Sequence, residues 1–252
     1  MKSKSNIILI IIGIAFSLSL KSQNVSGTIK YVAKHSWSKK YAAVDYISKA
    51  EKERIVYVWG HNDEWKQYGI LTFNQTTSEY KEIADEEEKY KYNYSERTQE
   101  YIIHRNFETN RMYDVIRMSG KLYLIDDTIT PINWKIKNDM REIAGHICMN
   151  AAYTDTLLNK NIVAWFALDM PYSFGPEKYY GLPGMILEID MNNGAVVITA
   201  EKVELSQSQI EIPLPKHKKP KVINQHDYYL IIAKTVSDCK KQKIPYFYRI
   251  RY

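Results

Sequence analysis

The chain has 252 residues, of which 45% are hydrophobic, and its formal net charge is +6. Loss of an N-terminal signal containing Lys2, Lys4 and Lys21 would lower this charge to +3, which gives no indication of a nucleic-acid partner. About 230 residues would then remain, enough for one sizeable core, and we expect a single domain over residues 23–252.

Residues 1–22 have the pattern of a secretory signal peptide. Lys2 and Lys4 form the charged start, and Ile7 to Leu20 form an apolar run of the length expected for the signal core. This run is shorter than the roughly 20 residues that a membrane-spanning helix needs. We therefore expect cleavage just after Ser22, export, and a mature chain that does not span the membrane.

The first half of the mature chain reads as strands, with one helix near its start. Residues 25–33 and 68–73 have the alternation of β-strands. Residues 41–54 place small and apolar side chains at helical spacing and predict a short amphipathic helix. Residues 79–93 are rich in charge and tyrosine and are interpreted as a solvated loop.

A series of short strand-like runs follows, without long helices between them. These runs cover residues 100–107, 111–118, 121–125, 132–136, 146–153, 162–168, 185–190 and 195–201. Ser119-Gly120 and Asn193-Gly194 are typical of tight hairpin turns. The pattern predicts a mainly β protein (β-rich α+β) built on an antiparallel sheet, and the 21 tyrosines suit its half-buried faces.

The end of the chain combines a linker with a helix. Residues 214–221 hold two prolines and five basic residues, which fits a basic, proline-rich linker rather than the interior of a sheet. Asn224 is a suitable N-cap for a terminal helix over residues 225–242, which has an apolar face that includes Cys239. We expect this helix to pack on the sheet.

The most distinctive motif is Gly181-Leu182-Pro183-Gly184, followed directly by Met185-Ile186-Leu187-Glu188. Pro183 suits the second position of a type II turn, and Gly184 would supply the positive φ that this turn needs at its third position. The motif therefore predicts a rigid turn that leads into a buried strand starting at Met185.

Several short motifs together resemble the GLPGLI family, a group of exported bacterial proteins whose biochemical role is not established. They are Trp134-Lys135-Ile136, the run from Ile143 to Cys148, Ala164-Trp165-Phe166, the run from Pro171 to Pro176, and the Gly181 motif. The resemblance implies location in the periplasm, at the outer membrane or outside a Gram-negative cell. By analogy, it also implies a curved, open half-barrel similar to periplasmic lipoprotein carriers, which leaves function open.

Conventional catalytic motifs are missing from the sequence. It contains no G-x-S-x-G nucleophile turn, no H-E-x-x-H zinc motif and no phosphate-binding Walker loop, so a non-catalytic role is favoured and no cofactor is expected. His146 and Cys148 stand at i and i+2 of a strand and share a face, which makes them weak candidates for copper. A buried strand with one polar side chain is the favoured interpretation, because a stable metal site needs more ligands.

Aromatic and cysteine residues provide the remaining candidates. Trp134, Trp165, Phe166, Tyr172 and Phe174 could line an apolar binding groove, although they would equally suit a sheet core. Arg105, Arg111 and Arg117 stand at even spacings, for which a solvated sheet face is favoured over an anion site. Cys148 and Cys239 could form a disulfide after export or remain free buried thiols.

These observations favour a non-catalytic binding or interaction module of the cell envelope, which uses a sheet face or an apolar groove. Its partner would be an envelope protein, a peptide or a lipid. The alternative is an envelope protein that handles copper through His146 and Cys148.

Overall fold

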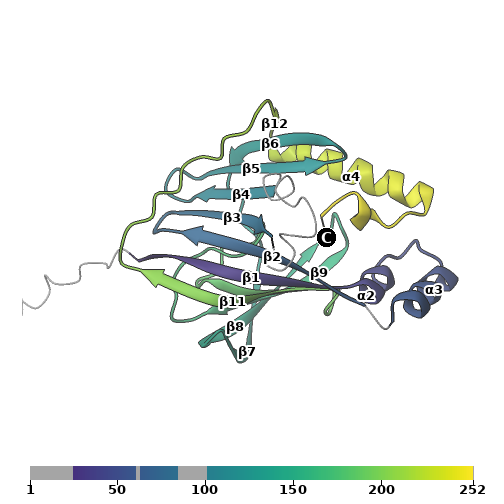
Figure 1. The fold of residues 1–252 in the computed structure, drawn as a ribbon, viewed down its shortest axis with the longest axis horizontal. Coiled ribbons are helices and arrows are strands. Elements are labelled where there is room, and N and C mark those ends of the chain that lie inside the picture. Colours follow the sequence, from purple (N-terminus) through teal and green to yellow (C-terminus); the bar gives the residue numbers. More distant parts are fainter. Residues whose placement is uncertain (1–24, 61–62, 85–100, 252) are drawn as a thin grey trace, which may run out of the picture.

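A single twelve-stranded sheet dominates the part of the chain that the computed structural model describes, namely residues 25–60, 63–84 and 101–251 (Figure 1). Its strands are β1 (Ser26–Ser36), β2 (Glu64–Phe73), β3 (Thr77–Ile83), β4 (Tyr101–Asn106), β5 (Arg111–Met118), β6 (Lys121–Thr128), β7 (Lys135–Ile143), β8 (His146–Asp155), β9 (Lys160–Ala167), β10 (Ile186–Met191), β11 (Val196–Ser206) and β12 (Lys221–Ile223). Their order in the sheet is β12-β6-β5-β4-β3-β2-β1-β11-β10-β9-β8-β7. The predicted fold class, a mainly β protein with a curved and open sheet, is confirmed.

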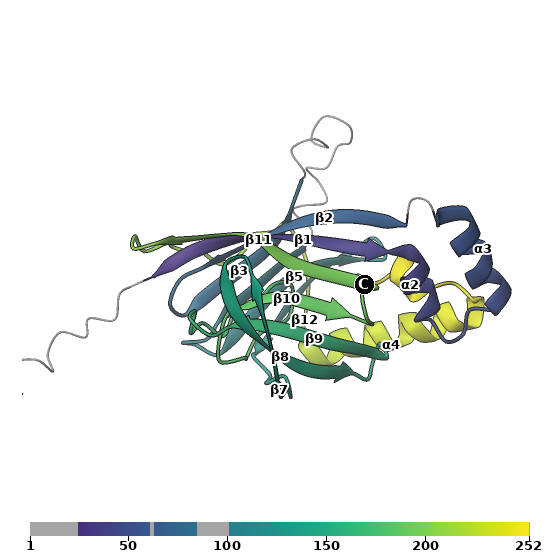
Figure 2. The same cartoon turned by 90° about the horizontal axis from the view of Figure 1, so that it is seen from below.

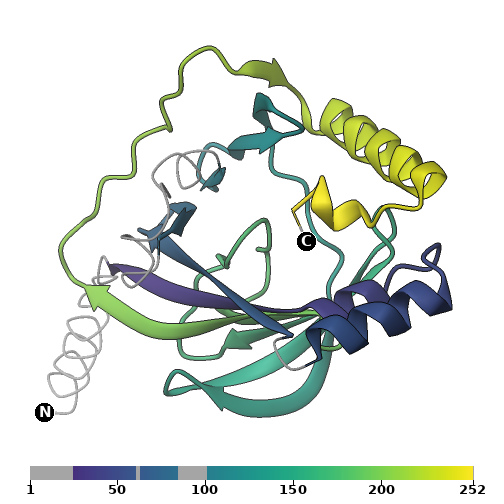
Figure 3. The same cartoon turned by 45° about the vertical axis from the view of Figure 1, so that its right-hand side comes forward.

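The strand order shows how the two halves of the chain meet. β1 pairs with β2 on one side and with β11 on the other, so the series β1–β6 and β7–β11 join at β1. All neighbouring strands are antiparallel except β12, which pairs with β6 in parallel. The sheet ends at β12 and β7 without closing, and Figures 2 and 3 show it wrapped around a concave face.

Three α-helices and one short 3₁₀-helix accompany the sheet among the described residues: α2 (Trp37–Ala42), α3 (Lys49–Trp59), α4 (Gln225–Gln242) and η2 (Tyr246–Tyr248). The expected terminal helix is α4, and the Asn224 side chain caps it by accepting a hydrogen bond from the Asp227 amide at 2.7 Å. Figure 3 shows α4 beside the open side of the sheet.

The helix predicted over residues 41–54 is wrong in its bounds, because the structure has two helices there. Ser36 caps α2, and Ser48 caps α3 by accepting a hydrogen bond from the Glu51 amide at 3.2 Å. A serine N-cap starts a new helix because its side chain satisfies a backbone amide that has no partner within the helix. The segment between them buries Val44 and Ile47, and Ile47 is one of the residues whose spacing suggested one continuous helix.

Two strand predictions also need correction. Residues 79–83 belong to β3 rather than to a solvated loop, because Tyr80 is buried and β3 pairs with both β2 and β4; residues 85–93 lie outside the described part. Residues 132–134 form a loop, and β7 begins at Lys135. The Ser119-Gly120 turn is confirmed by φ values of 50° and 79°, and Asn193-Gly194 by 54° and 86°.

The turn at Gly184 has a different physical basis from the one that the motif predicts. Gly184 is not among the residues with positive φ, whereas Gly181 is, at 88°. A Cβ atom at Gly184 would overlap the carbonyl oxygen of Ala167, so glycine is required there by close backbone approach. Backbone hydrogen bonds hold this contact, because the Ala167 amide donates to the Met185 carbonyl at 2.8 Å. The strand that follows, β10, begins at Ile186.

The remaining segments bear on the domain organisation. Residues 207–220 connect β11 to β12 without a helix or strand, and Lys221, the last residue of the expected linker, pairs in β12. The expected signal, residues 1–22, lies outside the described residues. None of the helices in the described ranges combines the length and apolarity that a membrane crossing requires.

Candidate functional site

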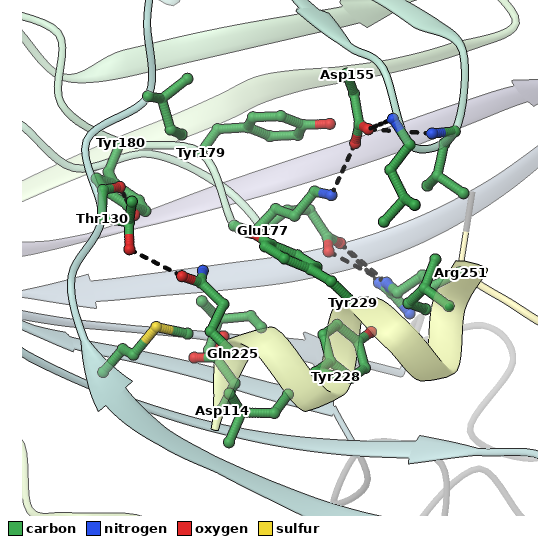
Figure 4. Close-up of a pocket in the computed structure, with 18 of the residues that line it drawn as sticks. Asp114, Thr130, Asp155, Glu177, Tyr179, Tyr180, Gln225, Tyr228, Tyr229 and Arg251 are labelled. Atoms are coloured by element: carbon green, nitrogen blue, oxygen red, sulfur yellow. Dashed lines mark hydrogen bonds and ion pairs between the residues drawn. The ribbon is translucent and has the colours of Figure 1, made fainter. Parts of the chain in front are cut away.

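A cavity of about 430 Å³ lies between the concave face of the sheet and α4 (Figure 4). β4, β5, β6, β8 and β9 contribute side chains from the sheet, and α4 contributes Gln225, Tyr228, Tyr229 and Ile232. Loop residues 130–133 and 177–180, the turn at residues 155–158 and the C-terminal residues Ile250 and Arg251 complete the wall. The volume falls within the usual range of small-molecule sites, about 300–1,000 Å³.

A buried ion pair between Arg105 on β4 and Asp114 on β5 forms one part of the wall. The guanidinium binds the carboxylate through two nitrogens, and the bond from Nη2 to Oδ2 measures 3.0 Å. Burial alone would lower the pKa of Arg105, but the charge of Asp114 raises it above its ordinary value. The arginine therefore stays charged, and the predicted solvated face at Arg105 is wrong, because Asp114 on the neighbouring strand compensates the buried charge.

A second ion-pair cluster joins the end of the chain to the cavity. Arg251 Nη2 lies 2.8 Å from Glu177 Oε1, and Arg251 Nη1 lies 2.8 Å from Glu82 Oε2. Glu177 is buried and has a φ of 57°, a left-handed conformation that is uncommon for a residue with a side chain. Such backbone strain persists only where surrounding contacts enforce it. Arg251 thus ties the C-terminal segment to the cavity wall.

The turn that follows β8 supplies a third charged pair. Asp155 Oδ1 accepts hydrogen bonds from the amides of Leu157 and Leu158 at 3.0 and 3.1 Å, and its Oδ2 accepts one from Lys178 at 3.2 Å. Burial alone would raise the pKa of Asp155, but Lys178 and the Leu158 amide hold it below the ordinary value. Asp155 therefore remains ionised and fixes the shape of the turn.

Lys160, at the start of β9, is the remaining ionisable amine in the cavity wall. Its side chain is buried, and its pKa is well below the ordinary value because of burial and the nearby charges of Lys178 and Lys40. Because the pKa is lowered in the folded state, protonation opposes folding below the pKa of the unfolded chain, about 10.4.

Replacement Lys160→Met is expected to alter how stability depends on pH. The unfolding free energy of the wild type relative to the variant should fall as pH decreases from about 11 toward 7, by up to about 1.4 kcal/mol per pH unit. Urea denaturation of both proteins across this range measures the difference. A difference that does not vary with pH would show that Lys160 titrates normally in the folded protein.

Tyrosines provide most of the aromatic surface of the cavity. Tyr179 and Tyr180 are buried, and burial raises the pKa of both. Tyr228 and Tyr229 project from α4, with ring centroids 6.3 Å apart. The high tyrosine count was therefore the signal for this site, but the sequence could not show which tyrosines converge on it.

The structure does not gather the five predicted groove residues into one site. Successive strand residues point to opposite faces of the sheet, so Phe166 lies in the core, whereas the guanidinium of Arg141 covers the Trp165 ring at 3.9 Å. Tyr172 and Phe174 stack on each other with ring centroids 6.3 Å apart. Trp134 packs against the cavity wall, since its ring centroid lies 5.7 Å from that of Tyr153, which lines the cavity.

His146 and Cys148 do not assemble a metal site with other residues that the structure describes. His146 Nδ1 lies 2.8 Å from Asp169 Oδ2, and no group of three His, Cys, Asp or Glu side chains suited to a metal ion occurs in the described ranges. Burial raises the pKa of the Cys148 thiol to about 11, which disfavours the thiolate that binds copper.

The candidate disulfide is not formed, since Cys148 and Cys239 are both free and buried. The Cys148 thiol donates a weak hydrogen bond to the His146 carbonyl on β8. Cys239 lies near the end of α4, where its carbonyl accepts a hydrogen bond from the Ile244 amide at 3.0 Å. The helix packs near β6 and η2, at a different part of the fold from β8.

The fold and the cavity define this protein's structural class, which is an open, curved β-sheet with a ligand-sized cavity under a terminal helix. A family model described as "Protein of unknown function (Porph_ging)" matches residues 156–188, which include the Gly181 motif. No curated protein matches the chain.

Solved structures described as PNGF-II have a similar fold. The one in the C2 space group has a TM-score of 0.52 and 14% identity, and the one in the P21 space group has 0.51 and 12%. Each comparison covers 82% of this chain but only 33% of the other, so this chain spans about a third of their length. At this identity the likeness shows the fold alone.

Proposed function

We propose that this protein is an exported binding protein of the bacterial cell envelope, which holds a small ligand between the sheet and α4 without transforming it. The observation that carries this proposal is the cavity of about 430 Å³. Its wall combines apolar side chains such as Ile116 and Ile232 with a few positioned polar groups, which is the usual composition of a ligand site.

The ion-paired groups of the wall support binding rather than catalysis. Arg105 is held in an ion pair with Asp114, and Lys178 is held in a second ion pair with Asp155. A general acid or base must be able to release or accept a proton near neutral pH. Carboxylates that are fixed by cations are poorly suited to this task, whereas they make a rigid wall.

Family type and location belong to the same proposal. The matched residues 156–188 contain the Gly181 motif, which supports a protein of the GLPGLI type. Together with the signal pattern in residues 1–22, this match supports a location in the periplasm, at the outer membrane or outside the cell. The resident ligand would come from that compartment.

Native mass spectrometry of protein purified from its own cell envelope tests the proposal. We expect a mature chain that starts after Ser22 and carries a bound molecule of defined mass. Ile132→Trp places a large ring in the cavity wall, whereas Leu205→Trp places the same ring on β11, where Leu205 is 53% exposed.

The ratio of ligand-bound to free protein should be at least tenfold lower in the cavity variant than in the wild type, and it should be unchanged in the surface variant. Circular dichroism and melting curves must show that both variants fold. Equal occupancy in Ile132→Trp and the wild type would place the ligand elsewhere, and an empty wild-type protein would contradict the binding function.

A further inference from the structure

The charges around the cavity balance one another. Among the described residues that line it, three cations pair with three carboxylates, in the pairs Arg105–Asp114, Lys178–Asp155 and Arg251–Glu177. Lys160 is the one further amine among these lining residues, and behind the wall Glu82 adds one carboxylate to the Arg251 cluster. The charges that could pair with a charged ligand are therefore already engaged in these ion pairs. Moving a charged group from water into such a site without a new partner is costly.

The tyrosines of α4 offer both ring faces and hydroxyl groups to the cavity. Tyr228 and Tyr229 are neighbours on α4, Tyr229 is 44% exposed, and no side chain of the described ranges hydrogen-bonds to either hydroxyl. Tyrosine presents an apolar ring face together with a hydroxyl that donates and accepts. A suitable ligand therefore has apolar faces and hydroxyl or amide groups at its edges.

A buried donor in the cavity wall, whose guanidinium lies over the Tyr180 ring at 5.3 Å, adds an independent observation. Arg105 lines the cavity, yet its Nε atom is buried and has no hydrogen-bond partner in the described part of the chain. Buried polar groups without protein partners are rare, and each one indicates strain, a bound water or ion, or a ligand site. At the other end of the wall, Thr130 donates to the Gln225 side chain at 2.9 Å and leaves the Gln225 amide group to serve as a donor.

We infer that the cavity recognises an uncharged saccharide, an inference that rests on the proposed binding function. A sugar ring has C–H faces that pack on tyrosine rings, because the ring face is electronegative and the C–H hydrogens are slightly positive. Its hydroxyls pair with tyrosine hydroxyls and with the outer lone pairs of Asp114 and Asp155. An acyl chain would instead leave these ion pairs and hydroxyls facing methylene groups, without compensation.

Saturation-transfer NMR and calorimetry with defined probes test this inference on the mature protein. The probes are neutral di- and trisaccharides, including the trimer of N-acetylglucosamine, with the trimer of glucosamine and trigalacturonate as charged controls. Palmitate and a capped tripeptide represent lipid and peptide ligands. We expect binding of at least one neutral sugar and at least tenfold weaker binding of the charged saccharides.

Variants locate the binding. Tyr228→Ala and Tyr229→Ala should each weaken binding of the neutral sugar about tenfold. Tyr57→Ala is the matched control, because Tyr57 is 88% exposed on α3 and does not line the cavity. Equal loss in the control, or unchanged binding in both cavity variants, would overturn the inference.

The test separates failure of the ligand class from failure of the binding function. Absence of binding by every neutral saccharide at about 10 mM overturns the saccharide inference. If palmitate or the peptide then binds and Ile132→Trp abolishes it, the binding function stands with another ligand. If no probe binds and the protein from its native envelope carries nothing, both fail.

Discussion

Gly184→Ala is expected to lower the melting temperature by about 6–12 °C, because it destabilises the fold by about 3 kcal/mol. The added methyl group would occupy the position of the Ala167 carbonyl oxygen, and the Phe166 ring lies 3.2 Å from it on another side. Neither neighbour moves easily, since Ala167 is in β9 and hydrogen-bonds to Met185. Thermal melting followed by circular dichroism measures the loss.

Asparagine at the same position separates the two explanations for this glycine. Asparagine tolerates positive φ, so Gly184→Asn would be mild if the backbone were left-handed. Close approach predicts that Gly184→Asn is at least as damaging as Gly184→Ala. Gly145 is the control, because its φ is 83° and a Cβ there meets nothing within 4 Å; asparagine should be better tolerated than alanine at that position. If Gly184→Asn is instead better tolerated than Gly184→Ala, the glycine is required for positive φ, as the type II turn predicts.

This glycine shows what a motif can and cannot predict. The sequence indicated a turn before a buried strand, and the structure has both. The need for glycine arises from Ala167, which lies 17 residues earlier in the chain, on a neighbouring strand. Such a contact depends on the pairing of β9 with β10, and local residue preferences carry no information about it.

The same limit explains why the cavity was not predicted. Periodicity and turn residues identified most strands and α4, because these signals are local. Arg105 and Asp114 belong to two strands whose register decides whether their side chains meet. Tyr228 and Tyr180 are 48 positions apart and line the same cavity only because α4 returns to the open side of the sheet.

Asp114→Asn is expected to destabilise the protein by about 3–5 kcal/mol, because it leaves the Arg105 charge buried without its carboxylate. The side chains of Arg105 and Asp114 are 4% and 5% exposed, so solvent screens the remaining charge only weakly. Urea denaturation should show the loss as a lower midpoint with an unchanged slope, since the fold itself is retained.

A second arginine–aspartate pair in the same region provides a matched control. Arg111 on β5 and Asp126 on β6 also pair across neighbouring strands, but their side chains are 40% and 30% exposed. Asp126→Asn should therefore cost only about 0–1 kcal/mol, because solvent screens the remaining arginine. Equal losses in the two variants would show that burial does not determine the cost.

A double replacement tests whether the cost arises from the unpaired charge or from lost packing. Arg105→Met combined with Asp114→Leu removes both charges and keeps much of the apolar volume. Buried ion pairs replaced by apolar residues in this way often give stability close to the wild type, whereas removal of one partner does not. We expect the double variant to recover most of the stability that Asp114→Asn loses. If it is less stable than the single variant, the pair contributes through its geometry, and the cavity wall depends on that geometry for its shape.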